Sequence, residues 1–132
     1  MDLFWRQLAS LLGPPGPIAP KQIWLPAPQV GERRMFLRAP QALTLSRLDA
    51  LLSGGSTPSV GVTLRHGPDA SAAGTAVTTA PITISSANGG TSNGTVVTSF
   101  QSPVVAMDHW LWLEVTAVSG SPAGLTVAVS FS

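Results

Sequence analysis

The sequence contains no cysteine and no tyrosine, and only 10% of its 132 residues are charged. Without cysteine there are neither disulfides nor thiolate metal sites, so packing alone must hold the fold together. An ordinary soluble domain has about 25% charged residues. Serine, threonine, glycine and asparagine therefore supply most of the polar surface. Such a composition is typical of β-rich surface and fibrous proteins, and it suits a protein that neighbours cover.

Long apolar runs and a strong basic excess are also missing. No stretch approaches the roughly twenty apolar residues of a membrane span. The first residues, with the acidic Asp2 and an apolar run interrupted at Gly13, do not make a convincing signal peptide. We therefore expect a protein that is made in a cytosol and stays soluble or joins an assembly there. The net charge of +1 argues against a nucleic-acid partner.

The few charges are unevenly distributed along the chain. All seven basic residues fall in the first 65 positions together with three acids, which gives 7 − 3 = +4. The remainder holds three acids and no basic residue, so its charge is −3. The group Arg33, Arg34 and Arg38 either meets an acidic partner or is a solvated basic face.

The first 31 residues differ from the rest of the chain. Residues 2–12 place apolar side chains at helical spacing, which predicts a short amphipathic helix that needs a surface to lie on. Residues 13–28 hold six prolines, so we expect a stiff, extended arm. The apolar residues of this unit should dock on another protein. The candidate interface residues are Leu3, Phe4, Trp5, Leu8, Leu11, Leu12, Ile23, Trp24 and Leu25.

From residue 32 onward apolar and polar residues alternate, which predicts an antiparallel β-sandwich or jelly-roll domain over residues 32–132. Residues 42–52 fit either a strand or a helix, and the flanking strands favour a strand. Residues 119–124 should join the last two strands as a hairpin. The remaining strands are expected at 34–38, 60–65, 76–79, 82–84, 95–98, 110–115 and 125–131.

Side chains capable of catalysis are sparse. His66 and His109 each have an acid nearby, Asp69 and Asp108 respectively. If the fold brought all four together, a metal site of imidazoles and carboxylates would form. Turn formation explains the same residues, since His66 precedes Gly-Pro and aspartate stabilises turns. We therefore predict that the protein is not an enzyme and binds neither cofactor nor metal.

The tryptophans are more informative than the histidines. Trp110 and Trp112 share one face of an expected strand whose other face belongs to the core. Exposed tryptophan pairs serve as anchors of protein interfaces or as platforms on which sugars stack. Alternatively, both rings cover a sandwich edge or lie beneath the chain's own arm. The aromatic residues of the arm, Trp5 and Trp24, favour docking and suggest that subunits exchange arms.

Five segments of the chain carry a resemblance to a known family: MFLRAPQALT at 35–44, STPSVGVTLRHGPD at 56–69, TSF at 98–100, WLWL at 110–113 and GLTV at 124–127. Together they resemble a small β-sandwich module found among structural proteins of tailed bacteriophages. The resemblance covers roughly residues 34–132 and follows strands and turns rather than a catalytic signature.

This resemblance implies a virion protein that is assembled in the host cytoplasm. The leading hypothesis is a head decoration (cement) protein, a homo-oligomer and by preference a trimer. It would bind the major capsid protein or other virion proteins and reach across its neighbours with residues 1–31. The alternative is a tail, baseplate or fibre module that binds host glycans through Trp110 and Trp112. Neither hypothesis involves nucleic acid or a membrane span.

Overall fold

A computed structural model describes residues 18–85 and 94–132, and these residues form ten strands and no helix. The predicted helix at 2–12 lies outside the described residues. The strands are β1 (Lys21–Pro26), β2 (Arg33–Arg38), β3 (Leu43–Ser53), β4 (Ser59–Gly67), β5 (Thr75–Ala76), β6 (Ile82–Ser85), β7 (Thr95–Val97), β8 (Val104–Val105), β9 (Trp110–Ser119) and β10 (Gly124–Phe131).

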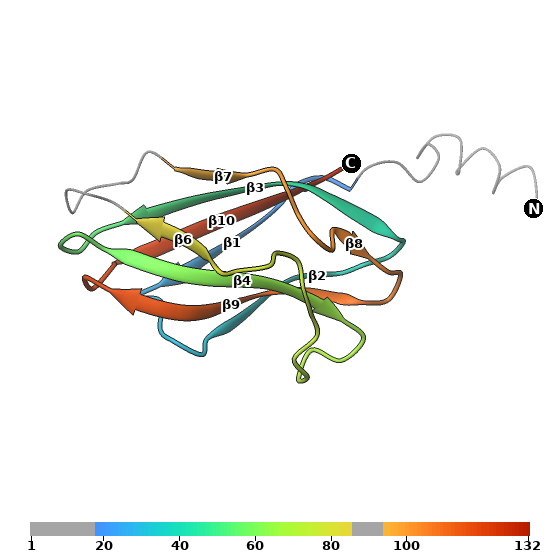
Figure 1. Ribbon diagram of the computed structural model, residues 1–132, viewed down its shortest axis with the longest axis horizontal. Helices are drawn as coiled ribbons and strands as arrows, with labels where there is room; N and C mark the ends of the chain where they lie inside the picture. Colours follow the sequence, from blue (N-terminus) through green and yellow to red (C-terminus); the bar gives the residue numbers. More distant parts are fainter. Residues whose placement is uncertain (1–17, 86–93) are drawn as a thin grey trace, which may run out of the picture.

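The strands form two antiparallel sheets, so the prediction of an all-β, sandwich-like fold is confirmed. Sheet A has the order β1-β10-β3-β7, with β8 also paired to β3. Sheet B has the order β2-β9-β4-β5, with β6 also paired to β4. Figure 1 shows β7, β3 and β10 in the upper part of the molecule and β4 and β9 in the lower part.

One hydrophobic core lies between the sheets. Inward-facing residues alternate with outward-facing ones along β9 and β10, and Leu111, Leu113, Leu125 and Val127 are all fully buried. Burying an aliphatic side chain of this size contributes about 1.5–3 kcal/mol. The alternation that predicted these two strands is therefore also what stabilises them.

The ambiguous segment is a strand, β3, and its helix-like spacing comes from a β-bulge. Ser130 of β10 is opposite Arg47, but the next residue, Phe131, is opposite Leu45, so β3 has one extra residue at Ser46. An extra residue shifts the alternation by one position. As a result Leu45 and Leu48, three positions apart, both face the core, a spacing that also occurs on one face of a helix.

The predicted hairpin at 119–124 is wrong. β9 pairs with β2 and β4 in sheet B, whereas β10 pairs with β1 and β3 in sheet A. The intervening turn therefore carries the chain from one sheet to the other. Alternation shows that a strand buries one face, but the pattern is the same whether the next strand lies beside it or across the core.

The Pro-rich segment also needs correction, because part of it belongs to the sandwich. Residues Lys21–Pro26 form β1, which pairs with β10 along its whole length. Leu25 is fully buried in the core and Ile23 packs against it, so neither is free to dock on another protein. Proline is tolerated here because β1 is an edge strand, and Pro20 and Pro26 stand just before it and at its end.

Candidate functional site

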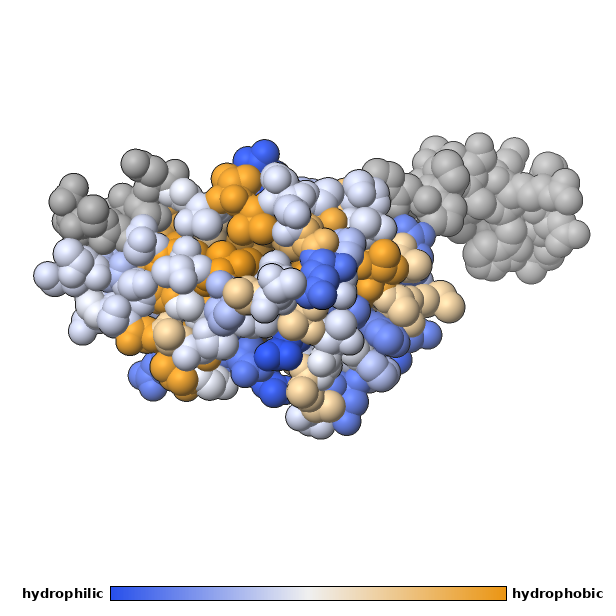
Figure 2. Space-filling model, viewed as in Figure 1, coloured by the Kyte–Doolittle hydropathy of each residue, from blue (hydrophilic) through white to orange (hydrophobic). Residues whose placement is uncertain are grey.

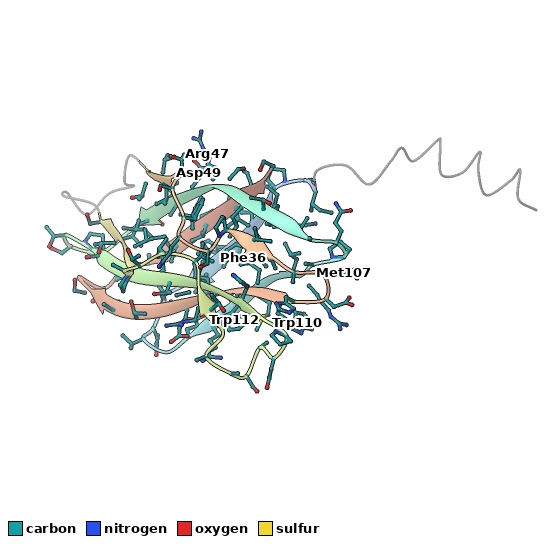
Figure 3. All side chains as sticks on the ribbon, turned by 45° about the vertical axis from the view of Figure 1, so that its right-hand side comes forward. Phe36, Arg47, Asp49, Met107, Trp110 and Trp112 are labelled. Atoms are coloured by element: carbon teal, nitrogen blue, oxygen red, sulfur yellow. The ribbon has the colours of Figure 1, made fainter. Side chains whose placement is uncertain are left out.

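The outer face of sheet B holds the tryptophan pair. Trp110 and Trp112 point away from the core, as predicted, and Figure 3 shows both on the side of the molecule opposite Arg47 and Asp49. The two rings differ in exposure. Trp110 is half-buried, whereas Trp112 has no solvent-accessible surface.

Trp112 is covered by the chain's own loop between β4 and β5. A Cβ atom on Gly74 of this loop would lie 2.6 Å from Cη2 of the indole, so the loop backbone touches the ring. On the strands at either side, Met35 and Arg65 are directly opposite Trp112. The indole Nε1 is buried without a hydrogen-bond partner among the described residues. A sugar therefore has no access to this ring.

Arginine side chains hold the loop in place. The guanidinium of Arg33 donates hydrogen bonds to the carbonyl oxygens of Ala70 (2.9 Å) and Ala72 (3.0 Å). The same guanidinium lies 5.8 Å from the centre of the Trp112 ring, within the range of a cation–π contact. Inside the loop, Asp69 accepts hydrogen bonds from the backbone and hydroxyl groups of Ser71, and these bonds lower the pKa of the Asp69 carboxyl.

The basic group at 33–38 is paired within the chain. A carboxylate oxygen of Glu114, Oε2, lies 3.5 Å from a guanidinium nitrogen of Arg33 and 3.5 Å from one of Arg65. Both contacts are ion pairs and are longer than a typical hydrogen bond. Arg34 binds Glu32 at 3.0 Å. Arg38 donates to the backbone oxygen of Asp108 at 3.2 Å, and its guanidinium lies 5.7 Å from the Trp110 ring. Arg33 is thus part of the outer face of sheet B, whereas Arg34 lies on the strand's other side, opposite the core residue Leu113. An acidic partner would have to compete with the pairs already formed.

The histidines lie at the end of β4 and just before β9. His66 is buried, and a ring nitrogen, Nε2, donates to the Ser102 carbonyl at 3.2 Å. Burial lowers the pKa of His66, with a smaller contribution from the charge of His109. The acids nearby in sequence do not join them in a metal site: in residues 18–85 and 94–132, no three His, Asp or Glu side chains are grouped so that they could hold a metal ion.

The outer face of sheet A is the opposite side of the molecule, and no loop of residues 18–85 or 94–132 covers its large apolar side chains. Three large apolar side chains remain accessible there: Trp24 of β1 (59% exposed), Leu51 of β3 (39%) and Val96 of β7 (53%). The register places Trp24 and Leu51 on either side of Thr126 in β10, with the Trp24 indole nitrogen over Gly124. In Figure 2 an apolar patch is visible over β7 and β3.

An open groove of about 430 Å³ runs over this face, and of the three apolar side chains Leu51 and Val96 line it. The side chains at the bottom of the groove are small, because they are Thr126 and Ala128, the outward residues of the inner strand β10. One end is polar: Arg47 and Asp49 form a two-bonded ion pair, with Nε 3.0 and 2.9 Å from the two carboxylate oxygens. The lining residues are Gln22, Arg47, Asp49, Ala50, Leu51, Gly94, Thr95, Val96, Thr126 and Ala128.

Sequence reasoning missed this face. Trp24 is one of the predicted interface residues, but the density of prolines predicts an arm at this position rather than a strand. The signal was present in the alternation of Gln22, Ile23, Trp24 and Leu25, which is the pattern of a strand with one buried side. Leu51 could have been found as the apolar residue that interrupts the polar side of β3.

No protein-family model matches the chain, and no curated protein matches it. Two solved structures from infectious bursal disease virus share weak similarity with it. The Gt strain structure has a TM-score of 0.31 and 17% identity over 86% of this chain. The Gx strain structure has a TM-score of 0.30 and 15% identity over the same share. The similar regions span only 31% and 34% of the viral chains, so this chain corresponds to about a third of their length. In the described ranges, no helix is long and apolar enough to cross a membrane.

Proposed function

We propose that the chain is a structural protein of a tailed-phage virion, a head decoration (cement) protein that attaches to the capsid shell through protein–protein contacts. It acts without catalysis, cofactor or metal. The observation that carries the proposal is the contrast between the two outer sheet faces: one is covered by the chain's own loop and arginines, and the other exposes Trp24, Leu51 and Val96.

An exposed apolar face of this kind fits an attachment role on physical grounds. Interfaces are rich in tryptophan at their centres and have polar rims. The outer face of sheet A combines the same two elements, with the apolar Trp24, Leu51 and Val96 spread over its strands and the charged Arg47–Asp49 pair at one end of the groove. The similarity of the sequence to phage structural modules gives the setting. Many copies on one shell multiply weak contacts, so the low charge of the chain is no obstacle to stable attachment.

The partner under this proposal is the major capsid protein or another virion protein, and the chain acts as a homo-oligomer, by preference a trimer. Residues 1–17, which lie outside the described part of the chain, supply the rest of the attachment surface through Leu3, Phe4, Trp5, Leu8, Leu11 and Leu12.

The test is to assemble particles with Trp24→Ala and to count the copies per particle by quantitative mass spectrometry. Truncating an anchor tryptophan typically costs about 2 kcal/mol, which is roughly a thirtyfold loss of affinity. Met107→Ala is the matched control, because Met107 is 60% exposed, close to the 59% of Trp24, but lies in the turn between β8 and β9 rather than on β1. Unchanged occupancy with Trp24→Ala would contradict the attachment role of this face. If the proposal is correct, an electron microscopy map of the particle should show the outer face of sheet A covered by another protein chain.

The second candidate function is a tail, baseplate or fibre module that binds host glycans. The observation in its favour is again Trp24, whose exposed indole lies on a face with the amide of Gln22 and the carboxylate of Asp49. The buried Trp112 does not favour it. Under this alternative, Trp24→Ala leaves particle occupancy unchanged and abolishes adsorption to host cells, so one variant with two measurements separates the two functions.

A further inference from the structure

We propose that residues 2–12 of one copy of this chain dock across the outer face of sheet A of a second copy. This inference deepens the attachment role and rests on it for the expectation that copies meet on a common surface. The occupant of the groove is an amphipathic segment of the same protein, which neighbouring copies exchange.

The groove has the dimensions of a short helix. It extends over β1, β10, β3 and β7, four adjacent strands. Neighbouring strands are about 4.8 Å apart, so the face measures about 14 Å from β1 to β7. Large apolar side chains stand on the edge strands β1 and β7 and on β3, and small ones on β10, where Thr126 and Ala128 form the floor. A rod lying across the strands would contact Trp24, Leu51 and Val96 together.

Residues 2–12 fit this groove in length and in pattern. Eleven residues of α-helix are about 16 Å long. At 100° per residue, one side of such a helix is apolar and the other carries Asp2, Arg6, Gln7 and Ser10, with Leu3 as the one large apolar residue among them. A helix of this length is marginal when alone in water and gains its stability from packing. The apolar side consists of Phe4, Trp5, Leu8, Leu11 and Leu12.

The point where the segment leaves the sandwich favours a second copy over the same one. The described chain begins at Ile18, four positions before Gln22, which lines the groove. Residues 13–20 contain four prolines, and an extended proline-rich segment advances about 3.1 Å per residue. Eight such residues reach about 25 Å, which is farther than the width of the groove. A stiff connection of this length carries residues 2–12 past their own groove and toward a neighbour's.

Disulfide trapping tests the proposal directly, because the chain has no cysteine of its own. Two full-length variants with different tags are mixed under mild oxidation, one with Leu8→Cys and the other with Leu51→Cys. We expect a mixed-tag disulfide to form rapidly, since each chain has a single thiol and the bond must join two copies. The control mixes Leu8→Cys with Met107→Cys, whose thiol is exposed outside the groove.

Three results would overturn the proposal. In the first, the mixed-tag disulfide forms no faster with Leu51→Cys than with the Met107→Cys control. In the second, a chain with both Leu8→Cys and Leu51→Cys closes into an oxidised monomer, which places the segment on its own groove. In the third, Leu51→Asp keeps the circular dichroism of the parent and also keeps its oligomer mass by light scattering, whereas we expect that variant to become monomeric.

The experiment also distinguishes this inference from the proposed function. If Trp24→Ala lowers particle occupancy but the Leu8–Leu51 disulfide does not form, the groove binds the shell rather than the segment. In that case the attachment role stands and the exchange is wrong. If the disulfide forms while Trp24→Ala leaves occupancy and adsorption unchanged, the exchange stands and the attachment role is wrong.

Discussion

Replacing Trp112 with alanine removes an indole that is fully excluded from solvent and in contact with Gly74 of the covering loop. A buried Phe or Trp that is cut back to alanine typically costs 3–5 kcal/mol. The native indole already carries an energetic cost, because Nε1 is buried without a hydrogen-bond partner and an unpaired buried donor costs about 1–3 kcal/mol. Removing the indole removes this cost as well. We therefore expect Trp112→Ala to lower the free energy of unfolding by about 3 kcal/mol, near the lower end of that range.

The assay is urea denaturation followed by circular dichroism, together with a thermal melt. For a domain of this size, 3 kcal/mol corresponds to a fall in Tm of roughly 10 °C. Two variants act as controls. Trp112→Phe should cost only about 1 kcal/mol, since it removes the unpaired N–H along with part of the ring. Trp24→Ala should also cost at most about 1 kcal/mol, because Trp24 is 59% exposed. If the free energy of unfolding of Trp112→Ala is within about 1 kcal/mol of the parent's, the loop does not hold the indole as described.

Three further variants test other parts of the structure. Gly74→Ala should lower Tm more than Gly31→Ala: both glycines have positive φ, which costs about 1 kcal/mol for alanine, but only at Gly74 would the new Cβ meet other atoms within 4 Å. Burial holds the pKa of His66 below the ordinary 6.5, so the unfolded chain takes up the proton first. Its contribution to stability is complete above about pH 6.5 and is lost as the pH falls through the folded pKa. His66→Gln should flatten the dependence of the urea midpoint on pH over this range. An unchanged slope of midpoint against pH would contradict the lowered pKa of His66. Glu114→Gln should cost about 1 kcal/mol at low salt and less at high salt, because it removes the counter-charge of two arginines; a cost that does not depend on salt would argue against these ion pairs.

The central strands could be predicted because burial on one side leaves a period of two in the sequence. β10 has this alternation throughout, and β9 has it from Trp110 to Val115, before the extra residue at Thr116. β3 was harder, since the extra residue at Ser46 places Leu45 and Leu48 at a spacing that a helix also produces. The density of prolines concealed β1, although prolines at the start and end of an edge strand cost no ladder hydrogen bond there.

The candidate surfaces could be predicted only in part, because exposure depends on residues that are distant in sequence. Trp112 and Trp24 both lie on outward faces of strands. They differ because Gly74, in the loop after β4, lies against the Trp112 ring. Among the described residues no loop covers Trp24 in the same way. Local alternation indicates which side a residue faces, but not whether another segment lies over it.

The position of β10 has a consequence for how this protein is made. β10 follows every other strand in the chain, yet it lies in the middle of sheet A, between β1 and β3. Until those last residues have left the ribosome, β1 and β3 have no strand between them, and the inner face of sheet B has only a partial cover. Strand pairings so far apart in sequence form slowly, and incomplete sheets expose edges that aggregate. Sheet A can therefore be completed only after residues 124–131 have been synthesised, although the strands on both sides of β10 are made earlier.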